Sequence, residues 1–339
     1  MEQGPKIRIV GRASEEKKKQ IQSQMDNFLN DSNAYFDRRQ IEKFKANERK
    51  KSKEEISFID FANRETSLLM REAGLDPFNI PSENLHIISK SLYKKVSNKE
   101  IGPAFSLPEI RTIILNQSSL KNNPLKMASS ILHEMLHAKA YISVESHNDG
   151  QTTSRFGLSV RSAQKEDKEG NKHEHFLGLH EAIVSETEKR LNKKLLDLPE
   201  LRKYKNWLES EEAKKIKEEV IKEKNIKEED IFWCEKDTKK CKVFPYPKQR
   251  KTFNYVCEEI QKQFPERFQD EEAVYKVFLN AHFTGRLLDL AHLVEDTFGK
   301  GSFRVLGNMD GTKSSGILHL ESFKKLRAEK LKNEKNSFN

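Results

Sequence analysis

The chain has 339 residues, a formal net charge of +9, and similar shares of hydrophobic (35%) and charged (34%) residues. This length suffices for one large domain or two ordinary ones, and the low apolar share indicates charged helices beside the core. The positive charge is spread over mixed Lys/Glu segments rather than gathered in one basic block. That distribution argues against nucleic acid as a partner.

The first residues contain no apolar signal region, and no apolar run is long enough to span a membrane. We therefore expect a cytoplasmic protein without membrane contact. Three cysteines occur, Cys234, Cys241 and Cys257. So small and odd a number argues against a disulfide framework and favours a reducing compartment, with ordinary thiols and one optional bridge.

The N-terminal part, residues 1–51, reads as a charged extension of one or two helices with a thin apolar stripe. Ser52 and Glu55 form the S-x-x-E pattern of a capping box, which predicts a helix that begins there and stops at Gly74.

Two Ile-rich stretches, "LHIIS" (85–89) and "EIRTIILN" (109–116), predict strands, and a helix follows from about residue 125. The segments "RFGLSVRS" and "HEHFLGL", with a polar loop between them, predict a β-hairpin that leads into a helix starting near His180. Residues 52–196 are thus the expected core.

Residues 197–251 are interpreted as a charged insertion with a solvated helix and a small loop or hairpin. Residues 252–325 return to helical apolar spacing and are expected to pack on the core, and 326–339 form a polar tail. Gly285, inside an apolar helical pattern, predicts a close helix–helix contact. The fold class expected is α+β, with a small sheet, a β-hairpin between two metal-bearing helices, and additional charged helices.

The stretch "ILHEMLH" contains the pattern H-E-x-x-H, formed by His133, Glu134 and His137. Residues four apart on a helix lie about 40° apart around its axis, so both imidazoles can reach one ion, and imidazole is a preferred zinc ligand. Glu134 is rotated by about 100° from His133 and is better placed to take a proton from water that zinc activates. The structural alternative is a pair of ordinary helix histidines.

A catalytic zinc needs a third protein ligand and one open position. The metzincin pattern fails because Ala140 and Ser143 stand where glycine and a third histidine are required. Glu181, in "GLHEAIVSE", is the favoured third ligand. The competing ligands are the histidines near it, namely His173, His175 and His180.

The combination of an H-E-x-x-H helix with the later element "LHEAIVSE" resembles the gluzincins, the thermolysin-like zinc metallopeptidases, and small bacterial proteins with a hairpin between the two helices. The resemblance covers roughly residues 80–195. It implies that His133, His137 and Glu181 bind Zn²⁺ and that Glu134 is the general base. Ser185 stands where this family often has an acidic residue, four positions after the ligand glutamate.

Groups that could orient a ligand or stabilise the transition state are less well defined. Ser185 and Glu188 share a helix face with Glu181. Tyr141 lies four residues after His137, and His282 and Arg286 belong to the C-terminal helical region. Packing or ordinary polar contacts are the alternative roles for Tyr141, His282 and Arg286.

The function expected is a zinc-dependent peptidase acting on a peptide or protein substrate. The alternative is a non-catalytic module that binds a protein or nucleic acid, with a structural or vestigial zinc. A zinc hydrolase acting on a non-peptide amide would use the same residues. The sequence leaves the substrate, the endo- or exo-action and the oligomeric state open.

Overall fold

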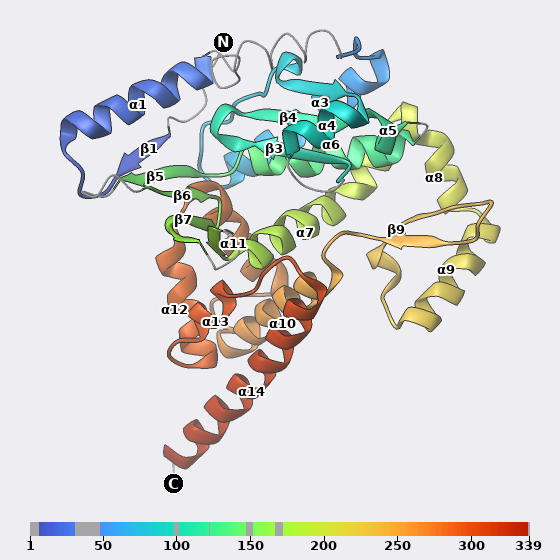
Figure 1. Ribbon diagram of the computed structural model, residues 1–339. Coiled ribbons are helices and arrows are strands. Elements are labelled where there is room, and N and C mark those ends of the chain that lie inside the picture. The colour runs from blue at the N-terminus through green and yellow to red at the C-terminus, as the bar shows by residue number, and fades with distance from the viewer. Residues whose placement is uncertain are drawn as a thin grey trace. The chain divides into compact units, whose positions relative to one another are not determined.

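The computed structural model describes residues 7–30, 48–97, 102–121, 123–146, 152–166 and 172–337 (Figure 1). These form two compact units of mixed α and β structure, in agreement with the expected α+β class. The first unit is built mainly from Gln22–Lys139 and Glu186–Pro245, and the second from Ile7–Ile21, Ala140–Ser185 and Tyr246–Asn339. The helix α7 (Leu177–Leu196) begins in the second unit and continues into the first.

The first unit contains a three-stranded sheet in the order β2-β4-β3, in which β2 is parallel and β3 antiparallel to β4. Its strands are β2 (Leu85–Ile88), β3 (Ala104–Leu107) and β4 (Thr112–Asn116). Every residue of β4 is buried, as expected of a central strand covered on both faces. The predicted strands 85–89 and 109–116 are confirmed, except that Pro108–Ile110 form a short 3-10 turn before β4.

Helices cover this sheet (Figure 1). α6 (Pro124–Ala138) packs against β3 and β4, and α3 (Lys53–Glu72) packs against α6. The capping box is confirmed, because Ser52 and Glu55 exchange their hydrogen bonds at the start of α3. Two shorter helices complete this part, α4 (Lys90–Ser97) and α5 (Gln117–Leu120).

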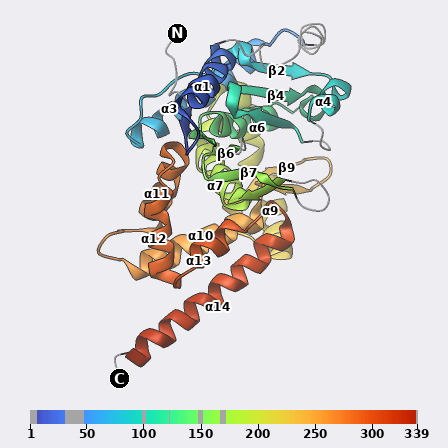
Figure 2. The ribbon, with the colours of Figure 1, turned by 60° about the vertical axis from the view of Figure 1, so that its left-hand side comes forward.

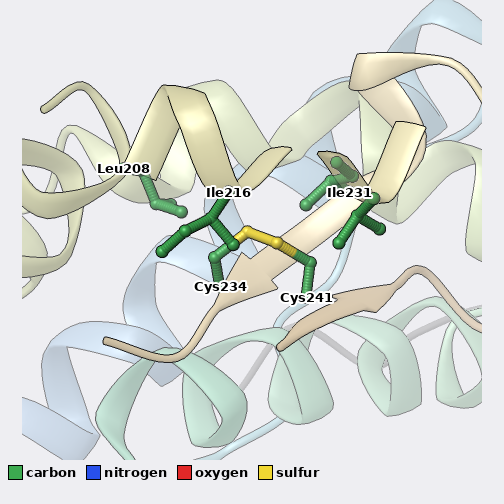
Figure 3. Close-up of a cluster of buried hydrophobic side chains, with 6 residues drawn as sticks. Leu208, Ile216, Ile231, Cys234 and Cys241 are labelled. Atoms are coloured by element: carbon green, nitrogen blue, oxygen red, sulfur yellow. A yellow bond between two sulfur atoms is a disulfide. The ribbon is translucent and has the colours of Figure 1, made fainter. Parts of the chain in front are cut away.

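The remainder of the first unit follows α7 and comprises α8 (Arg202–Leu208), α9 (Glu211–Lys224), β9 (Ile231–Cys234) and β10 (Cys241–Val243). The two strands form a hairpin, which is one of the two structures predicted for this segment, a small loop or a hairpin. α9 is exposed over most of its surface, as expected of a solvated helix, but Ala213, Ile216 and Val220 are buried. They line one face of α9, and Ile216 and Val220 pack in a cluster with the hairpin residues (Figure 3).

Cys234 and Cys241 lie opposite each other in this hairpin and form a disulfide (Figure 3). The bridge that the sequence left optional is therefore present, and both cysteines are buried in the cluster beside α9. Cys257 is a buried free thiol.

The second unit contains a five-stranded sheet in the order β1-β5-β6-β7-β8, antiparallel except for the β1–β5 pair. Its strands are β1 (Arg8–Val10), β5 (Ile142–Ser146), β6 (Thr152–Phe156), β7 (Ser159–Glu166) and β8 (Lys172–His175). The predicted hairpin is confirmed in β7 and β8. "RFGLSVRS" is not one strand, however: it turns at Gly157, which has a φ of 55°, and so joins β6 to β7.

The helices of the second unit are α10 (Pro247–Gln263), α11 (Glu271–Thr284), α12 (Leu287–Phe298), α13 (Ser302–Gly307) and α14 (Lys313–Ser337). α14 runs beside α10 (Figure 2). Gly285 is not inside a helix as expected: it caps α11 with a φ of 76°, and its close neighbour is the Tyr141 ring rather than another helix.

One further helix, α1 (Glu15–Asn30), confirms a helix in the charged N-terminal extension, and the segment 31–47 lies outside the described residues. No helix among the described residues is both long and apolar enough to cross a membrane.

Candidate metal centre

The helix α6 presents His133 and His137 side by side. Asn123 caps its start by accepting a hydrogen bond from the Lys126 backbone N–H, and Pro124 occupies the first turn, where its missing N–H has no cost. The apolar side chains of α6 are buried, as the sequence predicted; they are Met127, Ile131, Leu132, Met135 and Leu136. This packing fixes the helix and leaves the histidines together on another face.

The two imidazoles point the same ring atom at one another. Nε2 of His133 lies 3.2 Å from Nε2 of His137. Two nitrogens that bind one tetrahedral zinc at about 2.0–2.1 Å from the metal are separated by about 3.3–3.4 Å. The observed separation is therefore close to that of two ligands of a single ion.

A buried carboxylate fixes the orientation of His133. Nδ1 of His133 lies 3.1 Å from Oε2 of Glu188, and the other oxygen of Glu188 accepts a hydrogen bond from the Ser129 hydroxyl. A proton on Nδ1 that is donated to Glu188 leaves Nε2 with its lone pair, which is the tautomer a metal needs. Glu188 therefore lies where it can orient His133, as its place on the helix face of Glu181 suggested.

Glu181 completes the group. One ligand atom from each of His133, His137 and Glu181 lies within 4.8 Å of the other two. Glu181 and Glu188 lie on the same face of α7, two turns apart. The contact between Glu188 and His133 therefore also brings the Glu181 face of α7 towards the histidines. Glu181 lies in the second turn of α7, one turn later than expected, because the helix already begins at Leu177.

These three residues can bind a metal ion, and their chemistry indicates the kind. Two imidazoles and one carboxylate suit zinc and other first-row divalent metals better than Mg²⁺ or Ca²⁺, which prefer all-oxygen sites. The metal-binding group of three found among the described residues contains none of the competing histidines. His175 is exposed on β8, and the side chain of His173 lies outside the described part of the chain.

Glu134 is nearly buried, with 9% of its surface exposed, and is not a member of the ligand group. Its negative charge acts on Tyr93 of α4, a buried phenol that the sequence did not single out. Burial, and to a smaller degree the Glu134 charge, raise the pKa of Tyr93 well above its usual value, so this phenol remains protonated at neutral pH. No sequence signal links Tyr93 to Glu134, because α4 precedes α6 without a shared motif.

Two of the expected supporting residues have other positions. Tyr141 is not on the face of α6, because that helix ends at Ala138. It lies just before β5, where its backbone N–H donates to the His282 carbonyl and the Arg155 guanidinium lies 5.2 Å from its ring centroid. The Ser185 hydroxyl is fully buried and makes no hydrogen bond to either histidine of α6, whereas the Glu188 carboxylate contacts His133.

The remaining candidates lie in the second unit. His282 is fully buried on α11, and its ring stacks on that of His180 with 5.0 Å between the centroids. Arg286 stands at the start of α12. Ser129, which the sequence analysis missed, had a recognisable signal, because it lies one helical turn before His133 on the same face.

No known protein family, no curated protein and no solved structure matches this chain.

Proposed function

We propose that the protein is a zinc-dependent hydrolase that cleaves peptide bonds, with His133, His137 and Glu181 as the ligands. The observation that carries the proposal is the 3.2 Å separation of the two Nε2 atoms, combined with the carboxylate of Glu188 on the other nitrogen of His133. A hydrogen bond between two histidines has the same N–N distance, so the carboxylate behind His133 and the convergence of Glu181 are what favour a metal site over an ordinary pair. The resemblance of "HEMLH" and "LHEAIVSE" to the gluzincin motifs supports the same ligands.

Three protein ligands rather than four favour a catalytic role. Structural zinc sites are closed by four protein ligands, whereas catalytic sites retain one position for water or substrate. Among the described residues the ligand group has three members, and the nearby carboxylate of Glu188 is engaged by His133 and Ser129. This count supports a hydrolytic function over the alternative of a structural zinc in a binding module.

Zinc held by these three residues would polarise a substrate carbonyl and lower the pKa of a bound water, so that the water could lose a proton and become a nucleophile near neutral pH. Glu134 takes the proton from the attacking water and returns it to the leaving amine nitrogen. Glu188 holds His133 in the tautomer that binds the metal. The strand β3, at the edge of its sheet and beside α6, is a candidate to pair with an extended peptide.

The test uses the full chain and Glu134→Gln. We expect the wild type to release new peptide termini from a pool of unfolded proteins, measured by mass spectrometry. Glu134→Gln should retain the zinc content of the wild type and hydrolyse about 10²–10⁴-fold more slowly, because only proton transfer is lost. Glu186→Gln is the matched control, since this buried glutamate of α7 forms ion pairs with Lys189 and Arg190 on its own helix.

Two results would contradict the proposal. Hydrolysis that persists in Glu134→Gln would exclude Glu134 as the base. Zinc binding without hydrolysis of any peptide in the pool would favour the alternative, a module with a structural zinc.

A further inference from the structure

A second polar site lies in the first unit, in a cleft between α3 and the segment 77–82. The cleft has a volume of about 550 Å³, within the range of small-molecule sites. Its walls are tied together, because the Asn63 amide donates to the Ile80 carbonyl and its oxygen accepts from the Ile80 N–H, both at 2.9 Å. The largely buried side chains of Ile59 and Phe78 contribute its apolar surface. The cleft is thus preformed, with one apolar part.

Positive charges surround this cleft. Arg71 of α3 lines it and makes no ion pair with any residue that the structure describes. Lys139, only 1% exposed, lies behind the wall and donates to the Asn63 carbonyl at 3.1 Å and to the Ser67 hydroxyl at 2.9 Å. The Arg111 guanidinium lies 4.0 Å from the centroid of the Phe78 ring, and the Lys139 ammonium 5.6 Å from the same centroid. Phe78 is therefore in contact with two cations.

Few acidic residues line the cleft. Asp60 is the only carboxylate among the described lining residues. Glu65, on the same helix, is already shared between Arg64 at 3.1 Å and Lys194 at 3.0 Å. Lys139 bonds a carbonyl and a hydroxyl rather than a carboxylate, and the charges of Arg111 and Arg71 both repel it. Like charges held together beside low-dielectric protein attract a negative ion.

We propose that this cleft binds a small organic anion, with its carboxylate or phosphate at Arg71 and its apolar part against Phe78 and Ile59. Arg71 supplies a planar donor that matches either anionic group. Arg111 acts through its positive field from behind the wall, and Lys139 adds to that field when it is protonated. The apolar floor selects for an anion with a hydrocarbon or aromatic body over an inorganic ion. This site is independent of the proposed hydrolytic function.

Binding is tested on the full chain with phenylacetate, phenyl phosphate and the neutral phenylacetamide, by NMR titration of the protein. At least one anion should bind about tenfold more tightly than the amide, because a charge-assisted hydrogen bond contributes about 1.5–3 kcal/mol. The ratio of the two anion affinities decides between carboxylate and phosphate as the natural group. Equal affinity for the amide and the anions, or no binding of either anion, would overturn the proposal.

Arg71→Gln should raise the Kd of the tighter anion about tenfold, whereas Lys53→Gln should leave it unchanged. Lys53 is the matched control, because it is an exposed cation of the same helix outside the cleft. An unchanged Kd in Arg71→Gln would contradict the assignment. The titration is repeated after chelation of metal, and loss of binding on chelation would place the anion at the metal ligands instead.

Discussion

Two polar clusters of the first unit differ in the sign of the charge that they gather. Around His133, the imidazoles of α6 meet the buried carboxylate of Glu188 and lie near Glu134, so the cluster presents lone pairs and negative charge. Around Lys139, two residues beyond His137, the neighbours are Arg111 and Arg71. Groups of one sign that lie close together favour the binding of an opposite charge. The first cluster therefore suits a metal cation and the second an anion.

The largest change expected is the loss of a metal ligand. His137→Ala removes one imidazole and should weaken zinc binding more than about 100-fold, because even the outer partners of metal ligands contribute 10–100-fold. The check is a competition titration with a chromophoric zinc chelator. Affinity equal to that of the wild type would show that zinc binds elsewhere. The affinity of the cleft at Arg71 for the organic anion should not change in this variant.

A smaller effect is expected at the residue that orients the ligand. Glu188→Gln should lower zinc affinity by about 10–100-fold, because the amide presents a weaker acceptor to the Nδ1–H of His133. Glu186→Gln, on the same helix and also buried, should leave the affinity as it was. The same competition titration compares the two variants. An equal loss of zinc affinity in both variants would mean that Glu188 contributes only as a buried carboxylate that supports the fold, and not by orienting His133.

The smallest effect concerns stability at Lys139. Burial, with the charges of Arg111 and Arg71, lowers the pKa of Lys139 to about 7 from its usual 10.5. Between these values the unfolded chain binds a proton that the folded chain does not, so this residue makes stability rise as the pH rises. Relative to Lys139→Met, the wild type should gain about 1 kcal/mol of unfolding free energy from pH 7 to pH 8.

Urea unfolding of both proteins at the two pH values measures this difference, in chelator so that metal binding does not contribute. The methionine variant should be the more stable one at pH 7, because it places no ammonium in the interior. A stability difference that does not change with pH would mean that the Lys139 ammonium is not desolvated in the folded protein.

The sequence predicted the three candidate metal ligands better than their surroundings, and the reason is local geometry. His133 and His137 need only a helix to come together, and Glu188 follows from the spacing on α7 once Glu181 is chosen. Tyr141 was misplaced because the helical period was continued past Ala138. The β-branched residues of "YISVES" begin β5 there, and tertiary pairing with β6 overrides the helix.

Features that depend on distant parts of the chain could not be predicted. The Lys139 cluster joins α3, the turn before β4 and the end of α6, which share no motif. The bridge between Cys234 and Cys241 depends on the hairpin register, which places the two cysteines directly opposite each other. Spacing alone did not reveal that register.

The most direct test of the central claim is the zinc coordination itself. The full chain should bind one zinc ion per molecule, and zinc K-edge X-ray absorption should show two imidazole nitrogens, one carboxylate from Glu181 and a further oxygen at about 2.0–2.2 Å. Glu181→Gln should weaken this binding. A sulfur ligand, four protein ligands, or a folded chain that binds no zinc would contradict the account.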